Sequence, residues 1–441
     1  MSTKRSVYKK NSPNDKLVVY LIQRDIFDDL QVVDPIEGVA TIDKNKLKCS
    51  KIFARIRCTF RYGEQQLDDV LSGVTFYKEF FIQTKQIYPV DMNEDKDKYS
   101  DVQKHLIERF GDSALPFRFT LTHDIPASIT LQMDNRNSLD DNPCGIEYVL
   151  QVYASETPQC TIGKRNAVNL VIRRLTLAIP KPDDNVYTKE IIQPFHFHSG
   201  QLHITAILPK DVYYHGESIP LKLLIDNESS NIVRRLNIQV IQNVEITLFK
   251  RRTMRCNVVD METERGFPIN SHSTGWNEIF QLRPSLQEIR GQAVIALDGK
   301  LKHQDTNLAS STLIKDYRKK ENMGIIVQYM IRIKAVTGFG GRDVEMEIPI
   351  ILCHSRQQQE ITKAEEANDL IIEEFKRPTA KQRQTTEEME KMDNYLDYHP
   401  LLVLDLEKVK SCHDQLFTYN FCSQDSETQK YKIQVLYSPT D

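Results

Sequence analysis

The sequence predicts an all-β protein with two immunoglobulin-like β-sandwich domains, one short amphipathic helix and a long mobile C-terminal tail. Polar and apolar residues alternate strictly over residues 55–62, as expected for a strand with one side facing water. Similar strand-like runs recur between residues 16 and 350, separated by turn-rich segments at the spacing typical of sandwiches. At 441 residues the chain is too long for one compact core, which favours two domains.

The strand-like runs can be placed along the chain. In order, the expected strands are residues 16–22, 55–62, 115–121, 129–133, 146–153, 169–177, 202–208, 220–225, 236–249, 325–336 and 344–350. The last of them contains Pro349, which favours an edge strand because proline has no N–H to donate to a neighbour. A helix is expected between Asp101 and Gly111, where a stripe of apolar residues opposes polar ones: Val102, Leu106, Ile107 and Phe110.

Breaks in these patterns predict the domain organisation. The proline-rich residues 180–186 form a hinge between an N-terminal domain, residues 1–179, and a C-terminal domain, residues 187–355. Residues 356–441 form a regulatory tail, rich at first in Gln, Glu, Lys and Arg, with a docking strand near residues 370–377. The short apolar island of that strand could add to an exposed sheet edge; a solvated amphipathic helix is the alternative.

Composition narrows the class of protein. A formal net charge of −3 disfavours nucleic-acid binding, and no apolar run reaches the length of a transmembrane helix. The eight cysteines are scattered without a CxxC pair, as expected for reduced thiols in the cytoplasm. His196, His198 and His203 lie close together, but no nearby carboxylate or cysteine completes a set, so we expect no metal and no cofactor. The sequence has no nucleophile elbow or HExxH motif, which disfavours an enzyme.

Two adjacent arginines interrupt the apolar strand expected over residues 169–177. Because a buried, unpaired charge is very costly, Arg173 or Arg174 needs carboxylates from elsewhere in the chain. The candidates are Asp25, Asp298 and Asp305. A network of that kind can hold a structure closed until a stronger anion competes for the arginine, which suggests a charge-triggered switch. In the alternative interpretation the two arginines alternate between faces, one solvated and one paired locally.

Several segments resemble the arrestin family. They are residues 7–17, Tyr20-Leu21, Arg24-Asp25, residues 164–166, 171–173 and 213–217, and the highly specific run 296–311. The resemblance covers roughly residues 5–378. It implies two β-sandwich domains, a cytoplasmic protein, and binding to activated, phosphorylated G-protein-coupled receptors. Such binding blocks the G protein, and many family members then recruit endocytic machinery. No catalysis is implied.

The resemblance assigns a polar core and a path for receptor phosphates. Arg173 is similar to the phosphate sensor of the family, and its partners would be Asp25, Asp298, Asp305 and, from the tail, Arg377. The phosphate-binding positions would be Lys9, Lys10, Arg24, Arg109, Lys164, Arg165 and Lys302. Asn169 stands where the family usually has another phosphate-contacting arginine. Without the resemblance, a basic pair near a terminus is usually solvated surface.

The resemblance also assigns contacts for the tail and for the receptor core. The first strand and the helix would clasp the tail strand through Val7, Tyr8, Leu106 and Phe110 on one side and Ile371, Ile372 and Phe375 on the other. The receptor finger loop would contain Asp69, Val70 and Leu71. It is about two residues longer than the usual pattern, and a long polar hairpin loop is the alternative.

Membrane and endocytic contacts are further implications of the resemblance. A phosphoinositide-binding cluster would consist of Arg234, Arg235, Arg332 and Lys334, although alternating basic residues on a strand commonly form its wet face. Residues of the tail fit a clathrin-binding box of the form L-Φ-x-Φ-[DE], with Leu401, Leu402, Leu404 and Asp405 at the defining positions. The motif for the clathrin adaptor is incomplete, because Ile372 replaces a phenylalanine and Thr379 an arginine.

The expected function is therefore a phosphorylation-sensing adaptor, recruited to the plasma membrane on receptor activation. It would bind phosphorylated G-protein-coupled receptors, block G-protein coupling and promote desensitisation and endocytosis. The alternative is a general cytosolic trafficking scaffold of the wider arrestin clan without receptor-phosphate selectivity. The matched ion cluster around Arg173 favours the first, since a plain scaffold does not need one.

Overall fold

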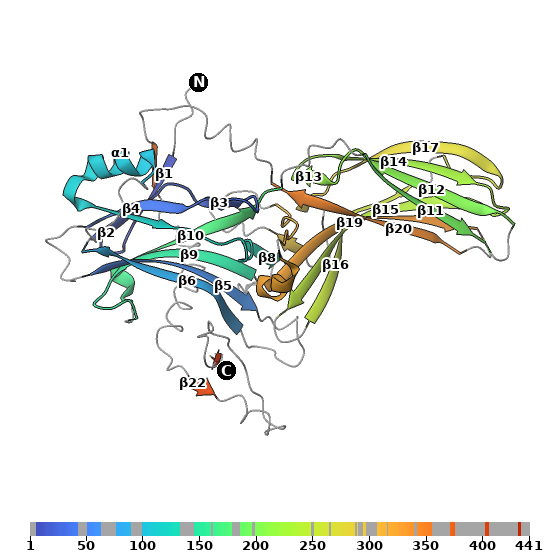
Figure 1. Ribbon diagram of the computed structural model, residues 1–441. Coiled ribbons are helices and arrows are strands. Elements are labelled where there is room, and N and C mark those ends of the chain that lie inside the picture. The colour runs from blue at the N-terminus through green and yellow to red at the C-terminus, as the bar shows by residue number, and fades with distance from the viewer. Residues whose placement is uncertain are drawn as a thin grey trace, which may run out of the picture. The chain divides into compact units, whose positions relative to one another are not determined.

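Strands dominate the computed structural model (Figure 1). It describes residues 6–42, 51–62, 76–89, 99–132, 145–159, 162–178, 186–195, 199–247, 251–263, 266–286, 289, 294–296, 307–314, 316–338, 342–354, 371–374, 402–404 and 431–433. The chain divides into two compact units. The N unit comprises Met1–Thr130, Asn137–Leu175 and Gln358–Asp441, and the C unit comprises Leu131–Arg136 and Thr176–Gln357. The prediction of an all-β fold with two sandwich domains and one short helix is confirmed.

The N unit contains two sheets. The first has the order β21-β1-β2-β4-β7, formed by Ile371–Glu374, Ser6–Asn11, Leu17–Leu21, Ile36–Ile42 and Ala114–Phe119. In the second, β8, β9, β10 and β3 follow one another; β5 also pairs with β9, and β6 pairs with β5. Their bounds are Ile129–Gln132, Gly145–Ala154, Ala167–Thr176, Asp25–Asp28, Ile52–Tyr62 and Phe76–Tyr88. Alternating side chains of both sheets are buried, as the period of two requires.

Helix α1, Asp101–Phe110, lies against β4 and β7 (Figure 1). It begins with a capping box, in which Ser100 and Gln103 each bond the backbone N–H of the other at 3.4 Å. The buried Gln103 amide donates to the carbonyl oxygens of Gly38 at 3.1 Å and Phe117 at 3.0 Å. A Cβ at Gly38 would lie 2.6 Å from the carbonyl oxygen of Tyr20, so the glycine permits this close packing. The buried Gln103 side chain therefore fixes the helix to β4 and β7 of one sheet.

The C unit also contains two sheets. One has the order β11-β12-β14-β17, formed by Tyr187–Pro194, Gln201–Leu208, Ile219–Asn227 and Ser273–Leu282. The other has the order β13-β20-β19-β15-β16, formed by Val212–Tyr214, Val344–Cys353, Ile325–Thr337, Val233–Thr247 and Arg251–Thr263. Because β20 lies between β13 and β19, it is not the edge strand that Pro349 suggested. Strand β13 pairs with Ile351–Cys353 only, and Pro349 lies before that stretch.

The remaining described elements are short strands and 3-10 turns. Strands β18, Val294–Ala296, β22, Leu402–Leu404, and β23, Tyr431–Ile433, contain three residues each, and β22 pairs with β23. The 3-10 turns are η2, Gly111–Ser113, η3, Lys164–Asn166, and η5, Tyr317–Met323. Across the described part of the chain, no helix is both long and apolar enough to cross a membrane.

Candidate functional site

The structure joins Arg173 of β10 to Asp25 of β3. These strands are neighbours, and the backbone N–H of Arg173 donates to the carbonyl oxygen of Arg24 at 2.8 Å. The side chains form a bidentate pair, Nε to Oδ1 at 2.7 Å and Nη2 to Oδ2 at 2.5 Å. The Arg173 side chain is 11% exposed and that of Asp25 32%, so the guanidinium is mostly desolvated while its partner reaches water. Asp298, Asp305 and Arg377, the other expected members of the polar core, lie outside the described residues.

A second ion pair, which the sequence analysis missed, lies on the other face of the same two strands. Arg174 Nη2 donates to Asp28 Oδ2 at 2.5 Å, and these side chains are only 3% and 7% exposed. The guanidinium also donates to the carbonyl oxygens of Pro126 at 3.1 Å and Thr122 at 2.9 Å. Nδ1 of His123 lies 2.7 Å from Asp28 Oδ1. Both arginines are thus paired with carboxylates, and neither is solvated.

The spacing of the acidic residues carries the signal for this second pair. Adjacent residues on a strand point to opposite faces, so Arg173 and Arg174 need carboxylates on opposite faces of the neighbouring strand. Asp25 and Asp28 are three residues apart, and an odd separation supplies one carboxylate to each face. Two adjacent arginines and two acids at odd spacing therefore predict two separate ion pairs.

The described basic residues of the expected phosphate path lie in the N unit. Lys10 Nζ donates to the carbonyl oxygen of Asn169 on β10 at 2.6 Å. The buried guanidinium of Arg24 lies 5.3 Å from the centre of the Tyr8 ring. Arg165 is exposed in η3, beside Lys164. Nδ2 of Asn14, in the turn after β1, donates a hydrogen bond to Oδ1 of Asn166 in η3 at 2.7 Å.

Of the remaining positions of that path, Arg109 and Lys9 lie among the described residues. Arg109 is exposed at the end of α1, with its guanidinium 6.0 Å from the centre of the Phe110 ring. Lys9 is half-buried on β1 and lies opposite Glu374 of β21 in the strand register. Lys302 lies outside the described residues.

The tail strand β21 is parallel to β1 and completes the first sheet of the N unit. Ile371 and Ile372 lie opposite Ser6 and Val7. Val7 belongs to a buried cluster between the sheet and α1 that contains Tyr20, Val39, Val102 and Leu106, with Phe110 packed against it. The rings of Tyr20 and Phe110 are 4.6 Å apart between centroids. Tyr8 instead contacts Arg24, as expected for the neighbour of Val7 on a strand. Phe375 lies outside the described residues.

In the C unit, three of the four expected phosphoinositide-binding residues are paired with carboxylates. Arg235 lies 2.9 Å from Glu262, and Arg332 lies 2.5 Å from Glu345. Lys334 lies 3.1 Å from Asp343 and 3.2 Å from Glu345. The bond from Arg332 lowers the pKa of the Glu345 carboxyl, and the bonds to Asp343 and Glu345 raise the pKa of Lys334. An anion must compete with these carboxylates; the fourth residue, Arg234, is exposed.

Other expected residues fall partly outside the described part of the chain. These are the finger-loop residues Asp69, Val70 and Leu71, the clathrin-box residues Leu401 and Asp405, and His196 and His198. Leu402 and Leu404 form β22, opposite Ile433 and Tyr431 of β23. His203 Nε2 lies 3.5 Å from Glu190 Oε2. Within the described ranges, no group of three metal-ligating side chains comes together.

The described fold consists of two β-sandwich units, and in the N unit ion pairs link neighbouring strands. Residues 19–178 match the family model described as Arrestin (or S-antigen), N-terminal domain, and residues 198–357 match Arrestin (or S-antigen), C-terminal domain. The chain belongs to the arrestin family. Arrestins are non-enzymatic adaptor proteins, and this chain is accordingly not an enzyme.

Named relatives agree with this assignment. Arrestin red cell isoform 1 of Oncorhynchus mykiss is 37% identical over 377 residues, which cover 84% of this chain and 90% of the relative. Beta-arrestin-2 of Homo sapiens is 36% identical over 355 residues, covering 80% and 84%. Arrestin-C of Homo sapiens is 33% identical over 391 residues, covering 87% and 98%.

Proposed function

We propose that this arrestin is a phosphorylation-sensing adaptor for G-protein-coupled receptors. It binds the activated, phosphorylated receptor, blocks G-protein coupling and promotes desensitisation and endocytosis. The observation that carries the proposal is the pair between Arg173 and Asp25, in which a mostly buried guanidinium is matched to a carboxylate that water still reaches. A plain trafficking scaffold, the alternative, has no use for such a pair.

A receptor phosphate is a suitable competitor for Arg173. A phosphorylated side chain carries a charge near −2 and three acceptor oxygens, whereas Asp25 offers one negative charge. Moving a two-state equilibrium from 1:99 to 99:1 needs about 5.5 kcal/mol of differential binding. Hydrogen bonds to charged groups contribute roughly 1.5–3 kcal/mol each, so two to four phosphate contacts supply that difference. Arg173 would be one contact, and the basic residues beside β1 would supply the others.

The tail strand supports the same mechanism. Strand β21 occupies one edge of β1, the strand that also carries Lys9 and Lys10. A phosphorylated receptor segment that adds to this edge displaces β21, because one edge accepts only one strand. In the closed state Asp298, Asp305 and Arg377 would complete the charge set around Arg173, as the arrestin resemblance implies.

The remaining contacts follow the family pattern. The protein would be cytoplasmic and recruited to the plasma membrane on receptor activation. Asp69, Val70 and Leu71 would enter the receptor core, and Arg234, with its three paired neighbours, would contact phosphoinositides. Residues 401–405 would bind clathrin, whereas the incomplete motif disfavours the clathrin adaptor.

A pull-down against one purified receptor in four forms, active or inactive and phosphorylated or not, tests the proposal. The wild-type chain should prefer the active, phosphorylated form. Arg173→Glu should bind the active, unphosphorylated receptor nearly as well, because the substitution repels Asp25 as a phosphate would. Arg318→Glu, a charge reversal at a 91% exposed side chain, is the matched control and should behave as wild type. Unchanged phosphate selectivity in Arg173→Glu would contradict the trigger.

A further inference from the structure

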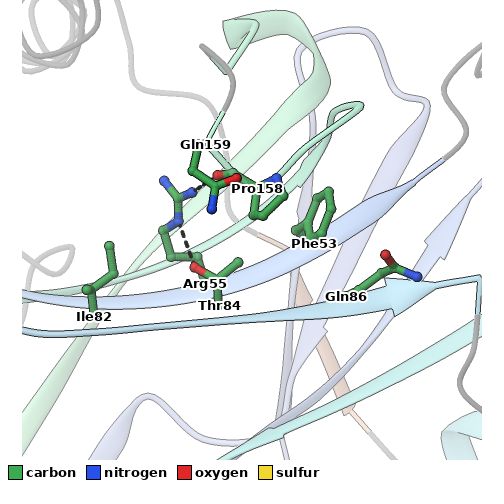
Figure 2. Close-up of a pocket in the computed structure, with 7 residues that line it drawn as sticks. All are labelled: Phe53, Arg55, Ile82, Thr84, Gln86, Pro158 and Gln159. Atoms are coloured by element: carbon green, nitrogen blue, oxygen red, sulfur yellow. Dashed lines mark hydrogen bonds between the residues drawn. The ribbon is translucent and has the colours of Figure 1, made fainter.

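The N unit carries a pocket of about 440 Å³ on the outer side of β5 and β6. Its lining residues are Phe53, Arg55, Ile82, Thr84, Gln86, Pro158 and Gln159 (Figure 2). Arg55 and Thr84 lie directly opposite each other on the two antiparallel strands. Ile82 and Gln86 lie on the same face of β6 as Thr84, since each is two residues away. The segment that follows β9 supplies Pro158 and Gln159.

Arg55 is held in this pocket by neutral groups. Its Nε donates to Thr84 Oγ1 at 3.1 Å, and its Nη2 donates to the Tyr153 hydroxyl at 2.6 Å and to the carbonyl oxygen of Pro158. The guanidinium lies 4.9 Å from the centre of the Tyr153 ring. Burial raises the pKa of Tyr153, so this hydroxyl stays protonated and donates to Pro158 at 3.0 Å. Among the described residues, no carboxylate pairs with Arg55, and its Nη1 is not used in these bonds.

The other lining residues indicate which kind of ligand could pair with the charge of Arg55. Among the described lining residues Arg55 is the only charged one, which favours a ligand with a single negative charge. Phe53, Ile82 and Pro158 form apolar walls, and Ile82 is 43% exposed, so an apolar group of a ligand can reach it. Gln86 and Gln159 add amide donors. The volume falls within the range of small-ligand sites, about 300–1,000 Å³.

We propose that this pocket binds a monocarboxylate joined to an apolar group. The carboxylate accepts from Nη1 of Arg55, whose orientation is already fixed by Thr84 and Pro158. The apolar group packs against Phe53 and Ile82. A phosphate monoester would bring a second negative charge that no described residue of the lining balances. The ligand is either a free organic acid or an acidic residue next to an apolar one in a peptide, and the site is separate from the receptor-phosphate mechanism.

Titrations of the full-length chain with matched probes test the proposal. The first pair is 4-phenylbutyrate and the neutral 4-phenylbutanol. The second is an acetylated, amidated pentapeptide with one glutamate between leucine and phenylalanine, and the same peptide with glutamine. In each pair the acid should bind at least about 10-fold more tightly, because the neutral partner lacks a charge-assisted bond. Tighter binding of the peptide acid assigns a protein partner, and tighter binding of phenylbutyrate assigns a free organic acid.

Three variants locate the binding. Arg55→Gln removes the charge, and Thr84→Glu neutralises it in place with a cross-strand ion pair that leaves the fold intact. Both should weaken carboxylate binding at least about 10-fold. Arg57→Gln is the matched control, since it makes the same charge change on the same face of β5 outside the lining, and should bind as wild type. Equal binding of acid and neutral probes, an equal loss in Arg57→Gln, or no saturable binding of either acid overturns the proposal.

Discussion

The buried pair between Arg174 and Asp28 allows a quantitative test of the N unit. The substitution Asp28→Ala removes a carboxylate that accepts from Arg174 at 2.5 Å and lies 2.7 Å from His123. Arg174 is only 3% exposed, so its charge is left desolvated with two backbone carbonyls as its remaining partners. Breaking a buried ion pair from one side typically costs about 3–5 kcal/mol. We expect a loss of that size in the free energy of unfolding of the N unit.

A double-mutant cycle separates the ion pair from other effects of the substitutions. Arg174→Met removes the guanidinium and leaves Asp28 buried beside His123. The double variant Asp28→Ala with Arg174→Met contains neither charge, and replacing a whole buried pair by apolar side chains is often nearly neutral. We expect the double variant to be more stable than the sum of the single losses predicts, by at least about 3 kcal/mol, because it leaves no charge unpaired.

Urea unfolding, monitored through the hydrogen exchange of individual amides, measures this loss of stability in the N unit. Exchange of the amides in β3 and β10 reports the N unit, and a loss of about 3–5 kcal/mol moves the urea midpoint by about 1–2.5 M at an m-value of about 2–3 kcal/mol/M. The single tryptophan of the chain, Trp276, lies in β17 of the C unit, so its fluorescence is an internal control that should not change. Additive losses, or a loss below about 1 kcal/mol in Asp28→Ala, would refute the reasoning.

The other predictions concern the tail and the C unit. A chain ending at residue 369 lacks β21 and should bind active, unphosphorylated receptor more strongly than a chain ending at residue 400; equal basal binding argues against tail docking. Replacing Leu401 and Leu404 by alanine should abolish clathrin pull-down while receptor binding persists, and continued pull-down points to another site. Burial, together with the neighbouring His354, lowers the pKa of His215 from 6.5 to about 3, so the unfolded chain binds the extra proton below pH 6.5. The contribution of neutral His215 to the free energy of unfolding is therefore fully present above pH 6.5 and is lost on acidification towards pH 3. Between pH 7 and pH 5 the free energy of unfolding should fall by about 2 kcal/mol, as measured by Trp276 fluorescence in urea. This fall should be smaller in His215→Gln.

Local patterns predicted the strands and the helix because an element that is buried on one side carries apolar residues at the period of that element, two for a strand and 3.6 for a helix. The apolar stripe from Val102 to Phe110 marked the helix, and the alternation over residues 55–62 marked most of β5. Pro349 shows where a local rule misleads. Proline excludes a donor at one position only, and β13 pairs with β20 beyond that position, at Ile351–Cys353.

Ion-pair partners on neighbouring strands were harder to predict, because the local periodicity of a sequence does not determine strand order or register. Arg332 and Lys334 suggested a cationic surface until β20 placed Glu345 beside both. The cost of a buried charge led to Asp25 as a candidate, and the family resemblance assigned it to Arg173. Arg174 and Asp28 were missed, although their spacing matches the same strand pair. The general lesson is that charges on a predicted strand should be read with the face that each one occupies.

The two ion pairs between β3 and β10 have different consequences for reversibility. An anion that takes Arg173 away from Asp25 acts on the water-accessible face only. Behind it, Arg174 stays bound to Asp28, and the Arg173 N–H still donates to Arg24, so the two strands keep their alignment. Once the anion leaves, the side chain of Arg173 can return to Asp25 by rotation alone, without any refolding of the β3 or β10 backbone.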